Sequence, residues 1–492
     1  MAYHSMPTTL DPHKIPLAAN IALADQLYDS LFVITDESEP TSLIIESWEL
    51  KNETTWVFHL KHNIYFHDGT PLTTKDIIYS FDRINQVEGL EYKAFTKRWK
   101  SYERLDDYAF QIVTEKPYSS LLRNLGNIYI LKYQEQLLPH DKFMEQKGYI
   151  GSGPYCLIAI EPNGDIRLIA NKYYHGAAVL VKKVRITRFV EVNERLRALQ
   201  EGKINLAEGL AEVNIPLLNL KNIDIIKAPT HRLLHLHLDF KDAPTTFVRD
   251  YKGNTLDHNP LRNTLVRKAI SLAINRKYLV DEILQGNALI AEQYMLPNMV
   301  GYMAGIRLDE YNPELAKQLL KKAGYEQGFN LVLHGTNDRY IKDHAIVLAI
   351  AKMLNEVGIK TIPITLGRKQ FFQDVQNYQY SAILIGFSPN GNIQGLLDEL
   401  IHSPVPEKGK GAFNFGRYTN PQVDQLIHEA GEQFNQVKRI RTQGRAIELA
   451  MNDYALIPLY FEQAIWGQSK NSQWEFWPNH FNGTVAQDIK PK

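Results

Sequence analysis

Strands and a long helix alternate in the second half of the chain, and this order constrains the fold more than any other feature. We expect strands at Phe329–His334, Thr361–Thr365 and Ser381–Ile385, with a helix at Lys342–Val357 between the first two. A strand–helix–strand sequence at this spacing predicts a βαβ unit and a partly parallel sheet. The fold class predicted from this pattern is α/β.

The loop that follows the last of these strands is a candidate binding loop. Ligands of open α/β sheets bind beyond the carboxyl ends of the strands, which is where this loop begins. Its side chains are mostly aromatic, hydroxyl or amide, and four of them are candidate ligand contacts: Phe387, Ser388, Asn390 and Asn392.

Other local signals predict further helices and strands. An Asn-Pro pair, typical of a helix start, occurs at Asn312 and again at Asn420, before helices expected up to Gly324 and over Val423–Phe434. Apolar residues at helical spacing predict one helix over Leu265–Leu284. Alternating residues predict strands, and these lie at Thr55–Leu60 and Arg185–Val190.

Size and charge exclude some classes of protein. The chain has 492 residues, enough for two or three domains. Its 55 basic and 55 acidic side chains balance, so we do not expect nucleic-acid binding. No apolar stretch approaches the ~20 residues needed to span a bilayer. Met1–Ser5 does not resemble a signal peptide, so the protein is either cytoplasmic or an exported protein whose leader has been trimmed.

Signatures of enzymes are weak. The sequence lacks the common phosphate-binding, nucleophile-elbow and zinc-protease motifs. Cys156 is the only cysteine and lies in an apolar run, which favours a buried structural thiol. The glycine-rich segment Gly151–Pro154 fits a tight turn better than a phosphate loop.

Two histidine-containing segments are candidate chemical sites. His231, His235, His237 and Asp239 offer possible metal ligands, and the last three would share one face of a strand. A half-exposed, histidine-rich strand is the commoner explanation. We therefore predict neither a metal nor another cofactor. His67 and Asp68 suggest catalysis, but their context predicts a turn whose Asp bonds the local backbone.

An ordered set of short segments resembles a known family: the dipeptide-, oligopeptide- and nickel-binding proteins of ABC importers, known as extracellular solute-binding protein family 5. The most diagnostic segment is FHDGTPLT at residues 66–73. Each segment is short, but their order along nearly the whole chain is specific. The other matching segments are Thr9–Lys14, Leu27–Leu31, Glu46–Glu49, Trp56–Leu60, Asp76–Phe81, Gly151–Tyr155, Asn171–Tyr174, Val266–Ile270, Ala273–Arg276 and Asn414–Pro421 with Asp424.

The resemblance implies a two-lobed fold of the type II periplasmic binding proteins with an additional inserted domain. The expected first lobe is discontinuous (1–28, 150–240 and 465–492), the inserted domain spans 29–149, and the second lobe spans 241–464. The resemblance also implies that a ligand is enclosed between the lobes by hinge closure and is delivered to permease subunits. An exported, periplasmic or cell-surface location follows, with membrane contact only through the permease or a lipid anchor, and a monomer is expected.

Departures from the family pattern concern the ligand. Peptide-binding members hold the ligand's α-ammonium with an aspartate three residues after an aromatic, and here Asn390 follows Phe387 at that position. An amide cannot neutralise a buried ammonium, which costs several kcal/mol. The sequence therefore predicts a solute without a free α-ammonium. Arg368 and Lys369 can meet an anionic group, although solvated surface charge is their commoner role.

The resemblance also implies ligand contacts in the first lobe and near its borders. A peptide would pair with the backbone near Lys14–Asn20, although Pro16 removes one donor. The contacts implied by family position are Leu17, Ala18, Asn20, Tyr92, Phe415 and Trp466.

Three functions are compatible with the sequence. The binding component of an importer is favoured, and no catalytic residue is predicted. A ligand-sensing protein with the same fold is the alternative, and a metal-dependent hydrolase has only the scattered histidines in its favour.

Overall fold

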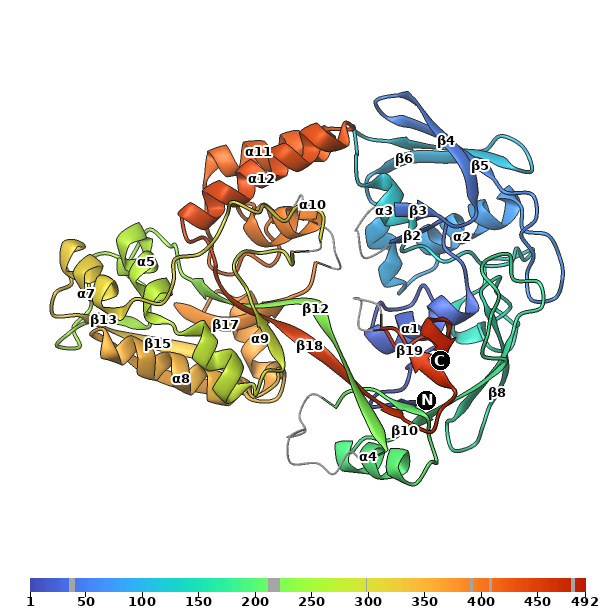
Figure 1. Cartoon of the computed structure of the whole chain (residues 1–492). Coiled ribbons are helices and arrows are strands. Elements are labelled where there is room, and N and C mark those ends of the chain that lie inside the picture. Colours follow the sequence, from blue (N-terminus) through green and yellow to red (C-terminus); the bar gives the residue numbers. More distant parts are fainter. Residues whose placement is uncertain (35–39, 211–221, 298, 390–392, 407–408, 479–482) are drawn as a thin grey trace. The chain divides into compact units, whose positions relative to one another are not determined.

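The chain forms two compact units. The first comprises Met1–Ala228 with Ala464–Lys492, and the second comprises Pro229–Gln463. The chain passes between them within two long strands, β12 (Ile223–Leu238) and β18 (Ile457–Ser469) (Figure 1). The expected three-domain division stays a prediction. The computed structural model describes residues 1–34, 40–210, 222–297, 299–389, 393–406, 409–478 and 483–492.

The first unit contains an antiparallel sheet in the order β4-β5-β7-β6 and a larger sheet in the order β18-β11-β1-β10-β9-β8. The predicted strand at Thr55–Leu60 is confirmed as β5. Helices and strands of this unit are β1 (Ala2–Tyr3), α1 (Ala18–Leu27), β2 (Phe32–Ile34), β3 (Pro40–Ser42), β4 (Ile45–Asn52), β5 (Thr55–Leu60), α2 (Thr74–Gln86), β6 (Trp99–Arg104), β7 (Ala109–Thr114), α3 (Leu121–Leu125), β8 (Tyr155–Ile160), β9 (Ile166–Ala170), β10 (Lys183–Arg188), α4 (Val192–Gln200), β11 (Leu206–Ala207), β19 (Trp474–Phe476) and β20 (Ile489–Pro491).

Turn predictions in the first unit are confirmed. The Thr70 backbone N–H donates to Asp68 Oδ1 at 3.1 Å, which is the local bond expected of that aspartate. A Cβ at Gly151 would lie 1.9 Å from the Leu27 carbonyl oxygen, so only glycine allows this turn to approach the end of α1. Cys156 is half-buried rather than fully buried, and burial raises the pKa of its thiol to about 11.

The second unit is built on a sheet in the order β13-β15-β17-β12-β18, with β16 paired to β15 and β14 paired to β18. Strands β15 and β16 are parallel and joined through α8, which confirms the predicted βαβ unit. Helices and strands of this unit are β13 (Val248–Asp250), α5 (Thr264–Ala273), α6 (Arg276–Tyr278), β14 (Ala288–Ile290), α7 (Pro313–Lys322), β15 (Phe329–Thr336), α8 (Asp343–Glu356), β16 (Ile359–Leu366), α9 (Arg368–Gln376), β17 (Ala382–Phe387), α10 (Ile393–Leu396), α11 (Pro421–Glu432) and α12 (Gln436–Asn452).

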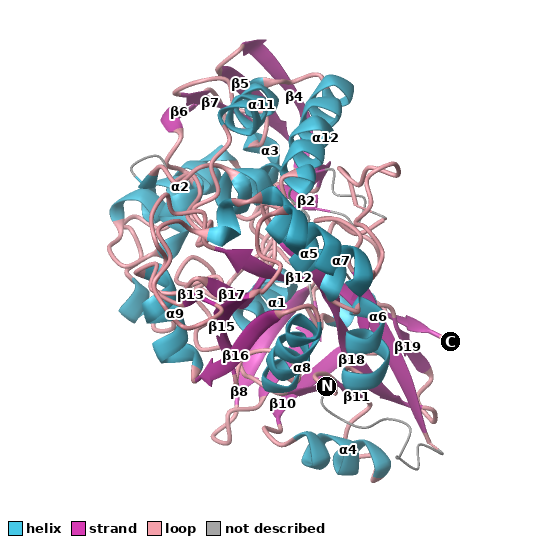
Figure 2. Cartoon of the chain, turned by 90° about the vertical axis from the view of Figure 1, so that its left-hand side faces the viewer, coloured by secondary structure: helices cyan, strands magenta, loops and turns pink. Residues whose placement is uncertain are grey.

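Helices cover β17 on both faces. On one face Leu384 packs in a core with Ile346 and Val347 of α8. On the other face Ile383 packs with Phe371 and Val375 of α9. Helices α5 and α7 pack together in this unit, as do α11 and α12 (Figure 2). Strand β17 is therefore buried on both faces, as strands of parallel sheets usually are.

The single helix expected over Leu265–Leu284 is wrong, because α5 ends at Ala273. Ile274 is extended, and the Asn275 side chain caps a new start by accepting from the Tyr278 N–H. The buried Arg276 then bonds the Pro458 carbonyl at 2.8 Å, which fixes the break against β18. Within the described ranges, no helix combines the length and the apolar character needed to cross a bilayer.

Candidate functional site

The carboxyl ends of parallel strands form a charged edge on the second unit. Strand β15 is parallel to β16 and to β17, so their last residues lie at the same edge of the sheet. Arg339 follows β15, and Arg368 and Lys369 follow β16, all with exposed side chains. We call this edge, with its three cations, the cationic edge.

Two aspartates at the cationic edge are engaged by neighbouring groups. Asp338 Oδ1 accepts the Arg368 backbone N–H at 2.7 Å. Asp343 is buried and its Oδ2 accepts from the Thr336 hydroxyl at 2.6 Å and from the Tyr340 N–H at 3.1 Å. These bonds hold the segment after β15 in place, because each carboxylate acts as a local cap.

A buried carboxylate beside β17 is neutralised by an arginine. Leu233 pairs with Phe387 in the sheet, so its neighbour Arg232 lies at the same end of β17. Arg232 Nη1 donates to Glu462 Oε2 at 3.0 Å, and the Glu462 side chain is 8% exposed. The sequence did not indicate this pair, since the partners are far apart along the chain.

The candidate loop begins with residues that the structure describes and continues beyond them. Phe387 and Ser388 are half-buried at the end of β17. Asn390 and Asn392 lie outside the described residues. Tyr340 fixes the start of the loop, because its hydroxyl accepts the Gly386 backbone N–H at 3.0 Å.

Aromatic rings gather at the end of β17. Phe415 is half-buried, with its ring centroid 6.0 Å from that of His237. Phe413, which the sequence did not single out, has its ring centroid 5.3 Å from that of Phe387 and 6.1 Å from that of Phe415. Aromatic alternation at 413 and 415 was the only signal in the sequence that could have indicated it.

The histidine-rich face of β12 is buried, so the expectation of a half-exposed strand is wrong. His235 and His237 are 0% and 2% exposed, because this face packs beneath the layer that contains α9. Burial lowers the pKa of His235 to about 4, and burial together with the nearby His235 lowers the pKa of His237.

The hydrogen bonds made by His237 and Asp239 on this face of β12 do not fit a metal site. His237 Nδ1 accepts the Gly416 N–H at 3.1 Å, so its ring proton is on Nε2. The Asp239 carboxylate is taken by Arg417 at 2.6 Å and by the Thr245 hydroxyl at 2.7 Å. In the described parts of the chain, no three or more His, Cys, Asp or Glu side chains are placed to hold a metal ion.

Candidate contacts in the first unit separate into exposed and buried residues. Leu17 and Ala18 are exposed at the start of α1. Asn20 is buried and bonds the Thr8 N–H at 2.8 Å, which fixes the preceding loop. Tyr92 is 2% exposed beside His13, and Trp466 is 1% exposed with its indole N–H bonded to Thr484 at 2.9 Å. The side chains of Asn20, Tyr92 and Trp466 are therefore part of the interior of this unit.

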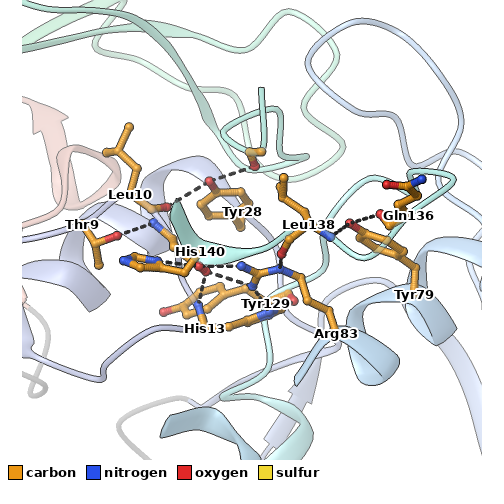
Figure 3. Close-up of polar contacts among 12 residues, drawn as sticks. Thr9, Leu10, His13, Tyr28, Tyr79, Arg83, Tyr129, Gln136, Leu138 and His140 are labelled. Atoms are coloured by element: carbon orange, nitrogen blue, oxygen red, sulfur yellow. Dashed lines mark hydrogen bonds and ion pairs between the residues drawn. The ribbon is translucent and has the colours of Figure 1, made fainter. Parts of the chain in front are cut away.

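A buried ion pair between Arg83 and Asp11 anchors the segment that precedes α1 (Figure 3). Arg83 Nη2 and Nη1 contact the two Asp11 carboxylate oxygens at 2.5 and 3.0 Å, and both side chains are 0% exposed. Arg83 Nη1 also lies 3.1 Å from His13 Nδ1, and His140 Nδ1 lies 3.0 Å from Asp11 Oδ2. This network joins α2 to the N-terminal segment.

Comparison with known proteins agrees with this fold. Residues 39–396 match the family described as Bacterial extracellular solute-binding proteins, family 5 Middle. Heme-binding protein A of Haemophilus influenzae is 24% identical over 473 residues, which cover 89% of this chain and 82% of that protein. Glutathione-binding protein GsiB of Escherichia coli is 23% identical over 474 residues, covering 94% of this chain and 89% of that protein.

A solved structure confirms the fold class. HbpA2 from Haemophilus parasuis superposes with a TM-score of 0.84 at 20% identity, covering 100% of this chain and 99% of that one. The predicted α/β fold of the type II periplasmic binding proteins is therefore confirmed. Members of the matched family are extracytoplasmic solute-binding components of ABC importers and are not enzymes. This chain belongs to family 5 of the bacterial extracellular solute-binding proteins.

Proposed function

We propose that this protein captures a small, net-anionic, peptide-like or other polar solute without a free α-ammonium for an ABC importer. The solute is enclosed between two lobes by hinge closure and is passed to the permease subunits. The cationic edge of the second unit carries this proposal, because it lies where open α/β sheets bind ligands.

The charges at the cationic edge support an anionic solute. Arg339, Arg368 and Lys369 are exposed, as is Asp338, which accepts the Arg368 backbone N–H. Asp343 is buried and accepts from the Tyr340 N–H, so the exposed cations outnumber the exposed carboxylate. Guanidinium groups suit carboxylates because they donate two parallel hydrogen bonds. The nearby buried carboxylate of Glu462 is neutralised by its ion pair with Arg232, so it does not repel an anion.

The sequence of the candidate loop supports a solute that lacks a free α-ammonium. Between Gly386 and Leu397 the chain has no aspartate or glutamate. A buried ammonium without a counter-ion costs several kcal/mol. Asn390 can donate a hydrogen bond to a carbonyl or carboxylate instead.

The named ligands of two relatives bracket the proposed chemistry. Heme, named for the relative in Haemophilus influenzae, carries carboxylates and no ammonium. Glutathione, named for the relative in Escherichia coli, is net-anionic but retains an α-ammonium. Both compounds carry carboxylates, and they differ in whether an α-ammonium is present.

A thermal-shift panel tests the proposal. It compares glutathione with N-acetylglutathione and Ala-Ala-Ala with N-acetyl-Ala-Ala-Ala, and we expect the acetylated member of each pair to raise Tm more. Arg368→Gln with Lys369→Gln should abolish the shift. The matched control is Lys321→Gln with Lys322→Gln at the end of α7, which are also exposed and should leave the shift intact. A larger shift from the free-amino compounds would overturn the proposal.

A further inference from the structure

Phe413 presents an aromatic ring to solvent beside the end of β17. Its side chain is 42% exposed, and no other phenylalanine in the described parts of the chain is as exposed. Phe387 and Phe415 flank it at centroid distances of 5.3 and 6.1 Å, with the Phe415 ring nearly perpendicular at 89°. The three rings form one surface, which we call the aromatic platform.

The backbone around Phe413 is held in place. The Phe413 N–H donates to the Glu399 carbonyl at 2.8 Å, and the Phe415 N–H donates to the Phe413 carbonyl at 2.9 Å. Asn414 is 1% exposed, and its amide donates to the His402 and Tyr418 carbonyls at 3.0 and 2.8 Å. The exposed ring is therefore pre-organised, so little conformational entropy is lost when a partner packs on it.

Two of the three rings of the platform, Phe415 and Phe387, pack against the hydrophobic core of the second unit. Phe415 packs against the cluster that contains Phe371, Val375 and Ile383, and Gly416 next to it donates its N–H to His237. Phe387 packs against a different cluster of this unit, which contains Leu233 and Leu396. A planar group that stacks on Phe413 would thus rest on a surface continuous with two cores.

We infer that Phe413 contacts a planar apolar group of the solute, so that the solute is an amphipathic anion with both a ring system and carboxylate-like charge. This inference rests on the proposed function, because it assigns a second group of the same solute. The platform starts at Phe387, the last residue of β17. Arg339 follows β15, the parallel neighbour of β17, and Arg368 and Lys369 follow β16, which lies on the far side of β15. Apolar rings and cations at one edge of the sheet match the two parts of such a molecule.

Binding of 1-anilinonaphthalene-8-sulfonate, a planar aromatic anion, tests the inference. The wild-type protein should give a saturable rise in fluorescence, and Phe413→Ala should weaken the affinity by about fivefold or more. Phe413→Tyr should restore it. Tyr251→Ala is the control, because Tyr251 is 48% exposed on the same unit and away from this edge, and it should leave the affinity unchanged.

The outcomes separate this inference from the proposed function. Unchanged dye affinity in Phe413→Ala, or absence of saturable binding to the wild-type protein, overturns the role of Phe413 even if the acetylated peptides are preferred. Loss of dye affinity in Phe413→Ala and retention in Phe413→Tyr support the role of Phe413, whichever peptides bind. Circular dichroism of each variant establishes that it is folded.

Discussion

The Tyr340 ring lies directly over Gly386, the penultimate residue of β17. Its hydroxyl accepts the Gly386 N–H at 3.0 Å, and a Cβ at Gly386 would lie 2.8 Å from Tyr340 Cε1. The start of the candidate loop is therefore set by a contact that requires both a tyrosine and a glycine.

Gly386→Ala should destabilise the second unit by about 1–3 kcal/mol, because the added methyl group forces the Tyr340 ring away from its place. Chemical denaturation measures this loss. Gly305→Ala is the matched control, since a Cβ there meets nothing within 4 Å and its φ lies outside the left-handed region. Equal stability of the two variants would show that the Tyr340 contact does not constrain the loop.

Asp11→Ala should lower the free energy of unfolding by about 3–5 kcal/mol, because it leaves the fully buried Arg83 guanidinium without its counter-ion. Urea unfolding followed by tryptophan fluorescence measures the change. Glu145→Ala, which removes an exposed partner of Lys142 in the same unit, is the control and should leave the unfolding midpoint unchanged.

Acid should weaken the same ion pair. Burial opposes the ionisation of Asp11, but the hydrogen bonds and charge of Arg83 outweigh it and hold the pKa of Asp11 below its usual value. A carboxyl whose pKa is lower in the folded state stabilises above its unfolded pKa of about 3.9, and that contribution is lost as pH falls through the folded value. Asp11→Ala should therefore be less sensitive than the wild type to a change from pH 5 to pH 3. An equal loss of unfolding free energy in the two proteins between pH 5 and pH 3 would contradict this prediction.

His235 should make the second unit sensitive to mildly acidic pH. Burial lowers the pKa of His235 to about 4 from 6.5, so the unfolded chain binds a proton that the folded chain excludes. The contribution of neutral His235 to the free energy of unfolding is fully present above the unfolded pKa of 6.5 and decreases as pH drops below that value. At pH 5 the loss from this residue is about 2 kcal/mol. His235→Gln should reduce the difference in unfolding free energy between pH 8 and pH 5 by that amount. An unchanged difference would mean that another group is responsible.

Asn312→Ala should cost about 1 kcal/mol of the stability of the second unit. The Asn312 side chain accepts the Leu315 N–H at 2.9 Å and thereby caps α7, which begins at Pro313. Asn312→Ser keeps the cap and should retain most of the stability in chemical denaturation. The same midpoint for both variants would argue against the cap.

Local signals predicted the elements of the second unit well. The helix expected at Lys342–Val357 is observed at Asp343–Glu356, and the strand expected at Thr361–Thr365 lies within β16. These elements were predictable because caps, glycines and apolar spacing all lie within the element itself. The break after α5 was not predictable, since it depends on Asn275 and on the bond from Arg276 to Pro458, which is distant in sequence.

Site chemistry was less predictable than the fold. The order of strands and helices indicated the loop after β17, but Tyr340, Glu462 and Phe413 become recognisable only when distant segments are brought together. Burial is also a tertiary property, which is why β12 was expected to be half-exposed. Periodicity reports which residues share a face, but it does not report what covers that face.

The central claim is that the solute lacks a free α-ammonium, and isothermal titration calorimetry with one matched pair tests it most directly. The wild-type protein should bind N-acetyl-Ala-Ala-Ala at least tenfold more tightly than Ala-Ala-Ala, a difference of about 1.4 kcal/mol. Asn390→Asp should reverse the preference by supplying a counter-ion for the ammonium. Tight binding of Ala-Ala-Ala by the wild-type protein that persists in Asn390→Ala would contradict the claim.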